Sequence, residues 1–188
     1  MATTEAIRDK NNLKRLADYW LKRGNYRNYA LIVLAVYTAL RISDLLSLTW
    51  ADVFSNESGE FKTHITLTEG KTGKAKKIAL NTKAVKALKL LHPHSRGIFI
   101  FSNNRKNEKP ISREQAWRII NAAAEAVGVQ GASPHALRKT FGYHAWVGEV
   151  NPVLIMDIYN HSSFEVTRRY LGIAQDDRDE VYLKADLL

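Results

Sequence analysis

The stretch "SPHALRKTFGYHAW" (Ser133–Trp146) combines a strong helix start with an unusual set of cationic side chains. Ser133 is a good helix N-cap, and the proline after it fits the first helical position, where a missing N–H group costs nothing. The first turns then carry His135, Arg138 and Lys139, although the positive end of a helix dipole favours anions. His135 and Arg138 are three residues apart and share one helix face. We infer that this helix start binds an anionic ligand.

The charge of the chain indicates which anion this is. Its 28 Lys and Arg residues against 19 Asp and Glu give a net charge of +9, which favours a polyanionic partner. From Lys62 to Arg96 there are nine basic residues and a single acid, Glu69, whereas residues 175–188 hold five acids and two basic residues. A solvated basic face is the alternative, but basic surface around an anion-binding helix favours double-stranded DNA.

Length and composition limit the class of protein. A chain of 188 residues with 45% hydrophobic content predicts one globular domain over residues 1–188. No stretch approaches the ~20 apolar residues of a membrane span, and the polar N-terminus is no signal peptide, so no membrane partner is expected. The absence of cysteine excludes disulfides and thiolate metal sites and fits a cytoplasmic, DNA-associated location in a prokaryote.

Periodicity predicts a mainly α fold with a small antiparallel β-sheet (α+β). Two strands, 63–68 and 75–80, flank the turn "EGKTGK", and "GIFIFS" (97–102) is expected as a third strand. The last predicted helix opens with a capping box formed by Ser162 and Glu165. The expected helices, in chain order, cover residues 25–40, 41–53, 81–91, 112–129, 133–146, 151–160 and 162–171.

Taken one by one, the other polar candidates have ordinary structural interpretations. Arg41 ends an apolar run and can be a buried arginine paired with Asp44, three residues on. His161 can be a loop histidine, and Tyr170 is one of eight tyrosines. The "GKT" at 70–72 is no phosphate-binding P-loop, because the glycine that such a loop needs five positions earlier is an isoleucine.

Taken together, four segments resemble the tyrosine recombinase (phage integrase) family, in family order and over about residues 34–173. "TALRISDLLSLTW" resembles the first-arginine motif, and "EGKTGKAKKIAL" resembles the hairpin with the catalytic lysine. "SPHALRKTFGYHA" resembles the His-x-x-Arg box. "NHSSFEVTRRYLGI" resembles the closing segment, with a tyrosine nine residues after a histidine. The resemblance implies the catalytic-domain fold of that family and an integrase or recombinase that cleaves and rejoins DNA strands at specific sites.

The resemblance also implies roles for single residues. Tyr170 is the expected nucleophile, which attacks a backbone phosphate and leaves a 3′-phosphotyrosyl link and a free 5′-hydroxyl. Arg41 and Arg138 are expected to bind the non-bridging oxygens and to stabilise the charge of the transition state. His135 assists proton transfer from the tyrosine, and His161 hydrogen-bonds the phosphate.

The remaining expected roles fall on the lysines and on one acid. Lys71 protonates the departing 5′-oxygen, with Lys74 as the alternative in the same turn, and Asp44 orients the first arginine. Since the arginines and the lysine supply the positive charge, no metal and no nucleotide cofactor are expected. The candidates for DNA contacts are Lys74, Lys76, Lys77 and Lys139.

The chain departs from the family pattern in a few places. Asn160 stands where glycine is usual before the histidine, and Lys139 stands where histidine is common. Only a helical lead-in (about 1–25) precedes the core helix, too short for the usual DNA-clamping domain. We therefore expect no N-terminal core-binding domain in this chain, which is either an excised catalytic domain or a naturally minimal recombinase. The resemblance implies a bacterium or a mobile element as its source.

The C-terminus carries a last expectation. The acidic tail (175–188) places Val181, Tyr182, Ala185 and Leu188 near one side of a short helix. It is expected to dock on a neighbouring copy when the protein assembles as a dimer or tetramer on DNA, with docking on its own domain as the alternative. Two further functions stay open: strand relaxation of the type IB topoisomerase kind, and an inactive DNA-binding relic.

Overall fold

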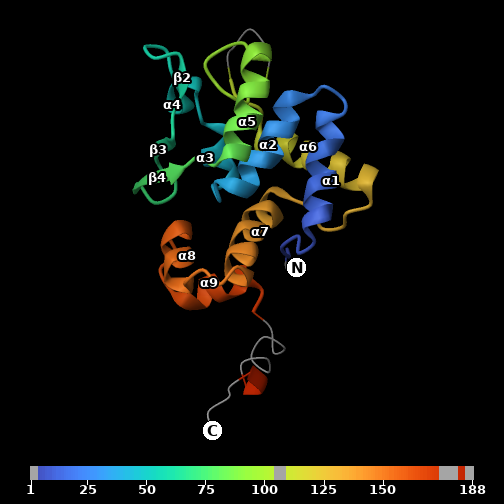
Figure 1. Cartoon of the computed structure of the whole chain (residues 1–188), viewed down its shortest axis with the longest axis vertical. Helices are drawn as coiled ribbons and strands as arrows, with labels where there is room; N and C mark the ends of the chain where they lie inside the picture. Colours follow the sequence, from blue (N-terminus) through green and yellow to red (C-terminus); the bar gives the residue numbers. More distant parts are fainter. Residues whose placement is uncertain (1–3, 104–108, 174–181, 185–188) are drawn as a thin grey trace.

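The computed structural model describes residues 4–103, 109–173 and 182–184 (Figure 1). The first half of this part comprises α1 (Lys10–Leu21), α2 (Tyr26–Tyr37), α3 (Ile42–Leu46), α4 (Trp50–Val53), β1 (Phe54–Ser55), β2 (Glu60–Phe61), β3 (His64–Thr68) and β4 (Ala75–Ala79). The second half comprises α5 (Thr82–Leu91), a 3-10 turn η1 (His92–His94), α6 (Arg113–Val127), α7 (Pro134–Val147), α8 (Pro152–Tyr159) and α9 (Phe164–Leu171).

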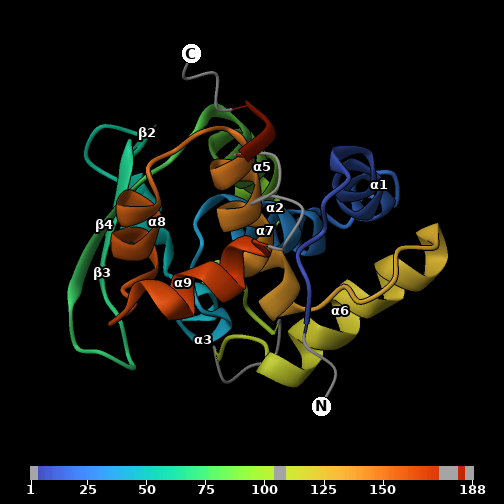
Figure 2. The same cartoon turned by 90° about the horizontal axis from the view of Figure 1, so that it is seen from below.

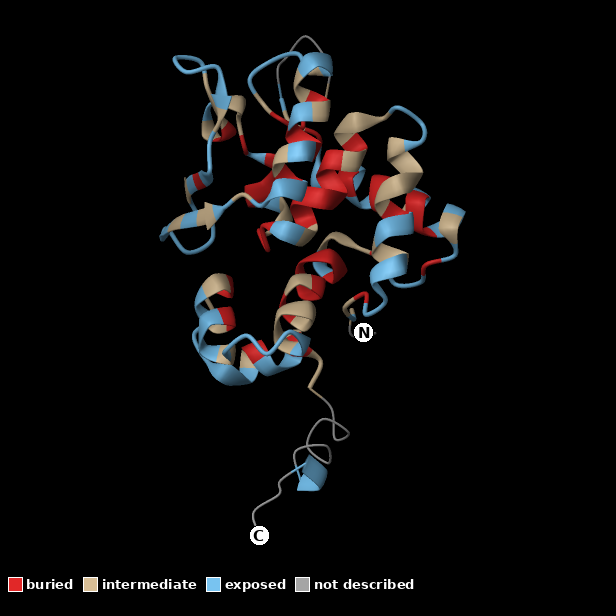
Figure 3. Cartoon of the chain, viewed as in Figure 1, coloured by how far each residue is buried: buried red, intermediate tan, exposed pale blue. Residues whose placement is uncertain are grey.

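The core is built around α2. This helix is apolar on nearly every side, and a helix of that kind is stable only when neighbours cover it on all sides. Here α1, α5 and α7 pack against it, and its residues from Ala30 to Ala35 are all buried. In Figure 3 the buried residues concentrate on α2 and on the segments that pack beside it. The predicted long apolar helix at the centre of the core is confirmed.

The β structure is small and antiparallel, as predicted. β3 pairs with β4 from His64 opposite Ala79 to Thr68 opposite Ala75, and β1 pairs with β2. The expected third strand is wrong: Phe99 and Ser102 form only isolated bridges. Ile100 and Phe101 are adjacent and both fully buried, whereas neighbouring residues of a strand point to opposite faces. Ile100 and Phe101 therefore form a buried turn, while Ile98 is exposed.

Local capping signals explain most helix starts. Asn81, Ser112, Ser133 and Asn151 each accept a backbone N–H bond as predicted. The expected box of Ser162 and Glu165 is wrong, because α9 begins after Ser163 and the glutamate lies 2.6 Å from Arg169 instead.

The helical stretch expected over 41–53 is divided into α3 and α4. The second piece starts anew because the N–H and the hydroxyl of Thr49 both donate to Asp52 Oδ2, at 2.7 Å each. This capping box sets the axis of α4 independently of α3.

A second, smaller cluster lies under α7, α8 and α9. Its buried members are Ala39, Ile155, Tyr159 and Leu171. α7 belongs to both clusters, since Leu137 lies in the main core while Phe141 packs on the second. Seen from below, the β3–β4 hairpin runs beside α8 (Figure 2). The segments with the candidate residues therefore meet between the two clusters. None of the helices in the described ranges is long and apolar enough to cross a membrane.

Candidate active site

Tyr170 lies at the meeting point of three separate segments. It projects from α9 and is half-buried. Its ring centroid is 4.5 Å from that of His161, which follows α8, and 5.2 Å from that of His135, which starts α7. The amine of Lys139 lies 5.4 Å from the same ring centroid. The fold thus brings together the tyrosine and both histidines that the sequence singled out.

Arg138 follows His135 by three residues on α7 and is buried, with 3% of its surface exposed. Its Nη1 donates to the carbonyl of Ala39, and its Nη2 donates to the carbonyl of Tyr159 at 3.2 Å. Burial and the nearby Arg41 lower the pKa of this guanidinium. The fork therefore joins α7 to the α2–α3 turn and to the end of α8, which fixes its position.

Tyr159 is one of two residues at this site that the sequence analysis missed. Its ring is stacked on His161 at 5.1 Å and lies 5.0 Å from Tyr170. Its hydroxyl accepts from the N–H of Gly142 at 2.7 Å and donates to the carbonyl of Arg138 at 2.6 Å. These two backbone groups are an i, i−4 pair of α7, so the hydroxyl is inserted into the hydrogen-bond ladder of the helix. Burial raises the pKa of this tyrosine, which keeps it protonated.

A glycine makes the insertion possible. A Cβ atom at Gly142 would lie 2.6 Å from the Tyr159 hydroxyl oxygen and 2.7 Å from a ring carbon. Glycine in the middle of a helix costs about 1 kcal/mol relative to alanine, so its presence needs a reason, and this close approach supplies one. The sequence signal was there: a glycine inside a predicted helix marks a position where another group comes near.

Both histidines are held neutral. The Nδ1 atom of His161 lies 3.0 Å from the hydroxyl of Thr167. Burial and the positive charges of Arg138 and Arg41 lower the pKa of His161 to about 4. Burial and then the nearby cations, Lys139 and Arg138, also lower the pKa of His135. A neutral imidazole can accept a proton, so both are available for proton transfer at neutral pH.

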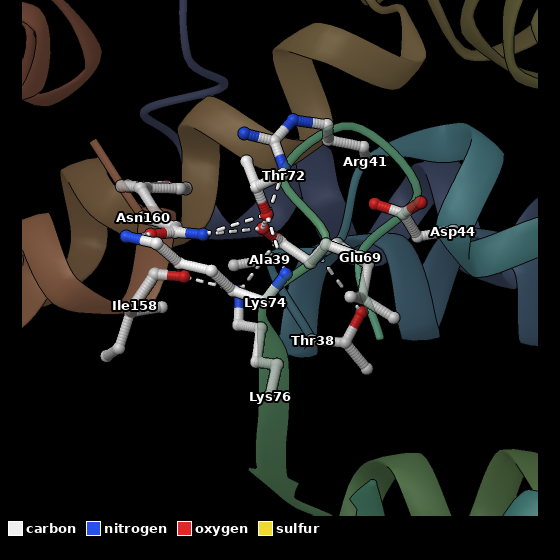
Figure 4. Close-up of polar contacts among 12 residues, drawn as sticks. Thr38, Ala39, Arg41, Asp44, Glu69, Thr72, Lys74, Lys76, Ile158 and Asn160 are labelled. Carbon is white, nitrogen blue, oxygen red and sulfur yellow. Dashed lines mark hydrogen bonds and ion pairs between the residues drawn. The ribbon is translucent and has the colours of Figure 1, made fainter. Parts of the chain in front are cut away.

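Arg41 is paired with an acid that the sequence analysis did not consider as a site residue (Figure 4). Its Nη1 lies 2.9 Å from Oε2 of Glu69, whose side chain has no exposed surface. The Nζ of Lys76 lies 3.6 Å from the other carboxylate oxygen. The sequence feature that could have indicated Glu69 as a site residue is composition, because it is the single acid among nine basic residues in the segment 62–96.

The carboxylate of Glu69 also accepts two neutral hydrogen bonds. The hydroxyl of Thr72 and the Nδ2 of Asn160 each donate to Oε2 at 3.0 Å. Burial alone would raise the pKa of Glu69, but the bonds from Asn160, Arg41 and Thr72 and the charge of Lys76 outweigh it and lower the pKa to about 2. Glu69 is therefore a buried anion inside a basic site.

Asp44 occupies a different place from the one expected. Instead of pairing with Arg41, its Oδ1 accepts from the N–H of Gly70 at 3.2 Å. It is 5% exposed, so this bond is shielded from water. Asp44 thus anchors the start of the turn between β3 and β4, and Glu69 is the acid that holds the arginine.

The lysines divide into two groups. Lys71 and Lys77 are exposed, and Lys74, also exposed, donates to Oδ1 of Asn160 at 3.0 Å. By contrast, Lys76 donates to the carbonyl of Ile158, and Lys139 is buried and donates to the carbonyl of Arg169 at 3.3 Å. The first group keeps its charge at the surface, while the second serves packing between the hairpin, α7 and the α8–α9 region.

The chain is similar to known proteins over most of its length. The family model described as "Phage integrase family" matches residues 8–176. The probable integrase/recombinase YoeC of Bacillus subtilis is 36% identical over 183 residues, which cover 97% of this chain and 97% of that protein. The tyrosine recombinase XerC of Pelobacter propionicus is 30% identical, and the match covers 85% of this chain but 52% of that protein. The chain thus corresponds to about half of this longer relative.

Solved structures agree with the fold. The XerA recombinase superposes with a TM-score of 0.78 and 22% identity, covering 99% of this chain and 67% of that one. The XerH recombinase, bound to palindromic difH in a post-cleavage complex, gives a TM-score of 0.75 at 18% identity and covers 99% of this chain and 54% of that one. The chain belongs to the phage integrase family of tyrosine recombinases. It is therefore an enzyme of DNA recombination.

Proposed function

We propose that this chain cleaves and rejoins DNA strands at specific sites, with Tyr170 as the nucleophile. The observation that carries the proposal is the contact of the Tyr170 ring with His161 and His135, next to two arginines. A tyrosine hydroxyl is a weak nucleophile, so it needs a base within reach. A neutral His135 can take the hydroxyl proton while the tyrosine oxygen attacks phosphorus. The bond that forms is Oη–P, and the bond that breaks is P–O5′.

The arginines stabilise the charge that the phosphate gains in the transition state. Arg138 is fixed by two backbone carbonyls, so its remaining N–H groups need little reorganisation to meet the phosphate. Arg41 is held from one side by Glu69, and 23% of its side chain stays exposed for the ligand. His161 donates a further hydrogen bond to the phosphate from its neutral ring.

Lys71 is the donor of the proton that the leaving 5′-oxygen needs. Lys74, the alternative, already donates its amine to Asn160, whereas the Lys71 side chain is exposed at the tip of the turn. The phosphotyrosyl link conserves the energy of the phosphodiester, so the attack of a 5′-hydroxyl can rejoin the strand without a nucleotide cofactor.

A nicked DNA duplex that traps the covalent product tests the nucleophile. Tyr170→Phe removes the attacking oxygen and should abolish the denaturant-resistant adduct while leaving DNA binding intact. Tyr37→Phe, at a 40% exposed tyrosine of α2 outside the site, is the matched control and should form the adduct normally. An adduct with Tyr170→Phe contradicts the assignment. Strand-exchange products support recombination, relaxation of supercoils without exchange supports a topoisomerase, and binding without any adduct supports an inactive relic.

DNA binding rests on the exposed lysines of the hairpin and of α5. Of the nine basic residues in 62–96, all except Lys76 are exposed. Together with the bacterial relatives, a DNA substrate supports the cytoplasm of a prokaryotic cell as the place of action. The family match over residues 8–176 supports a single catalytic domain over 1–188.

The proposed function also includes self-assembly of the protein on DNA. A groove of about 780 Å³ between α1, α2, α5 and α7 is lined by apolar residues that include Ile32, Val36 and Phe141. Its lining also holds one acid, Asp18, and four lysines, Lys10, Lys14, Lys83 and Lys86. The tail 175–188 combines five acids with apolar residues, which is complementary to this groove in charge and in polarity.

The occupant we propose for the groove is the tail of a second copy of the chain on DNA. Of the expected apolar side, Val181, Ala185 and Leu188 lie outside the described residues, while Tyr182 is 80% exposed. Deletion of residues 177–188 should spare binding to one site but weaken cooperative binding to paired sites in band-shift titrations. Charge reversal of Lys10 and Lys14 to glutamate, on α1 and outside the basic segment 62–96, should reproduce the loss. Unchanged cooperativity in the truncated protein refutes docking in trans.

A further inference from the structure

We propose that Asn160 and Glu69 are positioning residues for the cleavage reaction. Together they clamp the β3–β4 turn, which carries Lys71, onto the α8–α9 turn, which carries His161. The inference rests on the proposed function, because it assigns the clamp to the proton donor of that reaction. Neither residue needs to touch DNA in order to act in this way.

A single amide group makes three hydrogen bonds between the two turns (Figure 4). The Nδ2 of Asn160 donates to Glu69 Oε2 and to Thr72 Oγ1, at 3.0 Å each. Its Oδ1 accepts from the Nζ of Lys74 at 3.0 Å. Three residues of the hairpin turn are therefore bound to one side chain of the α8–α9 turn.

Position 160 requires a side chain with a particular set of hydrogen-bonding groups. Only a side-chain amide offers two donors and an acceptor on one short stem, which is what Glu69, Thr72 and Lys74 require. The backbone of Asn160 is left-handed, with φ of 56°, and it ends α8. Asparagine tolerates that conformation better than most residues, whereas glycine fits it but lacks the amide. An aspartate would place a second carboxylate against Glu69.

The clamp acts on Lys71 through its neighbours. On one side, the N–H of Gly70 donates to Asp44 at 3.2 Å. On the other side, Thr72 is held by Glu69 and Asn160, and the N–H of Gly73 donates to the carbonyl of Glu69 at 2.8 Å. The backbone of Lys71 is fixed from both directions, while its side chain stays free to reach the leaving oxygen.

Glu69 connects the same clamp to the phosphate-binding arginine. Its Oε2 receives the Asn160 amide and lies 2.9 Å from Arg41 Nη1. One buried carboxylate therefore positions three parts of the site. These are the turn with the proton donor Lys71, the arginine Arg41, and the α8–α9 turn that leads to Tyr170. Loss of the amide should leave the residues present but the lysine displaced, and displacements of about 1 Å can cost a hundredfold in rate.

The test uses a leaving group that needs no proton. In one DNA substrate the scissile bond is P–O5′, and in a second it is P–S5′, whose thiolate leaves unprotonated because a thiol, with pKa about 8.5, is far more acidic than an alcohol. Asn160→Gly should cleave the oxygen substrate about tenfold more slowly and the sulfur substrate at nearly the wild-type rate. Lys71→Ala should behave in the same way, whereas Arg41→Ala should be slow on both.

Asn160→Asp provides the matched variant. It keeps the size of the side chain but replaces the donor by a carboxylate, so it should be slower than the glycine variant on the oxygen substrate and should also recover on sulfur. Band shifts and thermal melts should show unchanged DNA binding and an intact fold for both variants.

The outcomes distinguish failure of the clamp from failure of the proposed role of Lys71. If sulfur restores Lys71→Ala but not Asn160→Gly, or if Asn160→Gly cleaves oxygen normally, the clamp is refuted and the proposed reaction stands. If sulfur fails to restore Lys71→Ala, the lysine is not the proton donor, and the purpose assigned to the clamp falls with it.

Discussion

Replacing Glu69 by glutamine keeps the size of a fully buried side chain and removes its charge. The wild-type carboxylate lies 2.9 Å from Arg41 and 3.6 Å from Lys76, and it accepts hydrogen bonds from Thr72 and Asn160. Glutamine can accept some of these bonds, but it leaves two partly buried cations, Arg41 and Lys76, without this counter-charge. We expect the variant to fold and to be less stable than the wild type at neutral pH.

The size of the effect follows from the pKa of Glu69, which is about 2 in the folded protein against a reference of 4.5. A folded pKa below the unfolded one means that the unfolded chain binds the proton more readily as the pH falls. The carboxylate therefore contributes its full stability above pH 4.5 and loses it as the pH falls toward 2. At about 1.4 kcal/mol per pKa unit, the total is about 3 kcal/mol, and about 2 kcal/mol of it is lost between pH 7 and pH 3.

Urea unfolding of both proteins at a series of pH values from 7 to 3 measures this directly. The free energy of unfolding of the wild type should fall toward that of Glu69→Gln by about 2 kcal/mol over this range. Other groups, His161 among them, titrate in both proteins, so the difference between the two curves isolates Glu69. A difference that does not change with pH would refute the assignment of Glu69 as a buried, charged anion.

The other predictions concern the packing, the transition state and the DNA-binding face. Gly142→Ala should destabilise the fold by about 1–3 kcal/mol in chemical denaturation, since the new Cβ would lie 2.6 Å from the Tyr159 hydroxyl; an unchanged midpoint would contradict this close approach. Arg138→Lys keeps the charge but cannot bond both the Ala39 and Tyr159 carbonyls and the phosphate, so single-turnover cleavage should fall about a hundredfold or more. Binding to non-specific duplex should weaken with salt at a slope of about 0.9 per phosphate contact, and glutamine at the exposed lysines of 62–96 should flatten that slope.

The sequence predicted those parts of the site whose signals are local. Ser133 and its proline specify the start of α7, and the spacing of His135 and Arg138 places both on one face of that helix. These features depend on hydrogen bonds within a few residues, so propensity and capping rules are sufficient. The same rules gave the central position of α2, because its apolar residues leave it no exposed face.

The pairing of Arg41 with Asp44 failed for a physical reason. The i, i+3 relation holds only when both residues are helical. Arg41 is the N-cap of α3 and has extended backbone angles, with φ of −65° and ψ of 145°. Its side chain therefore leaves the chain in a different direction from that of Asp44. The acid that it contacts, Glu69, is also bonded to Asn160, which is 91 positions away in the sequence. Partners at such distances are chosen by the tertiary fold.

Glu69, the single acid of a strongly basic segment, offsets part of the positive charge around His161. Burial and the charges of Arg138, Arg41 and Lys76 lower the pKa of His161, while Glu69 opposes that effect. With Glu69 in place, burial and the positive charge that remains still keep His161 neutral at physiological pH. A bound phosphate would add negative charge beside the same ring, so its pKa should rise toward the ordinary value as DNA binds. A larger fraction of His161 would then be protonated when the phosphate arrives, and an imidazolium is a stronger hydrogen-bond donor to a developing negative charge than the neutral ring.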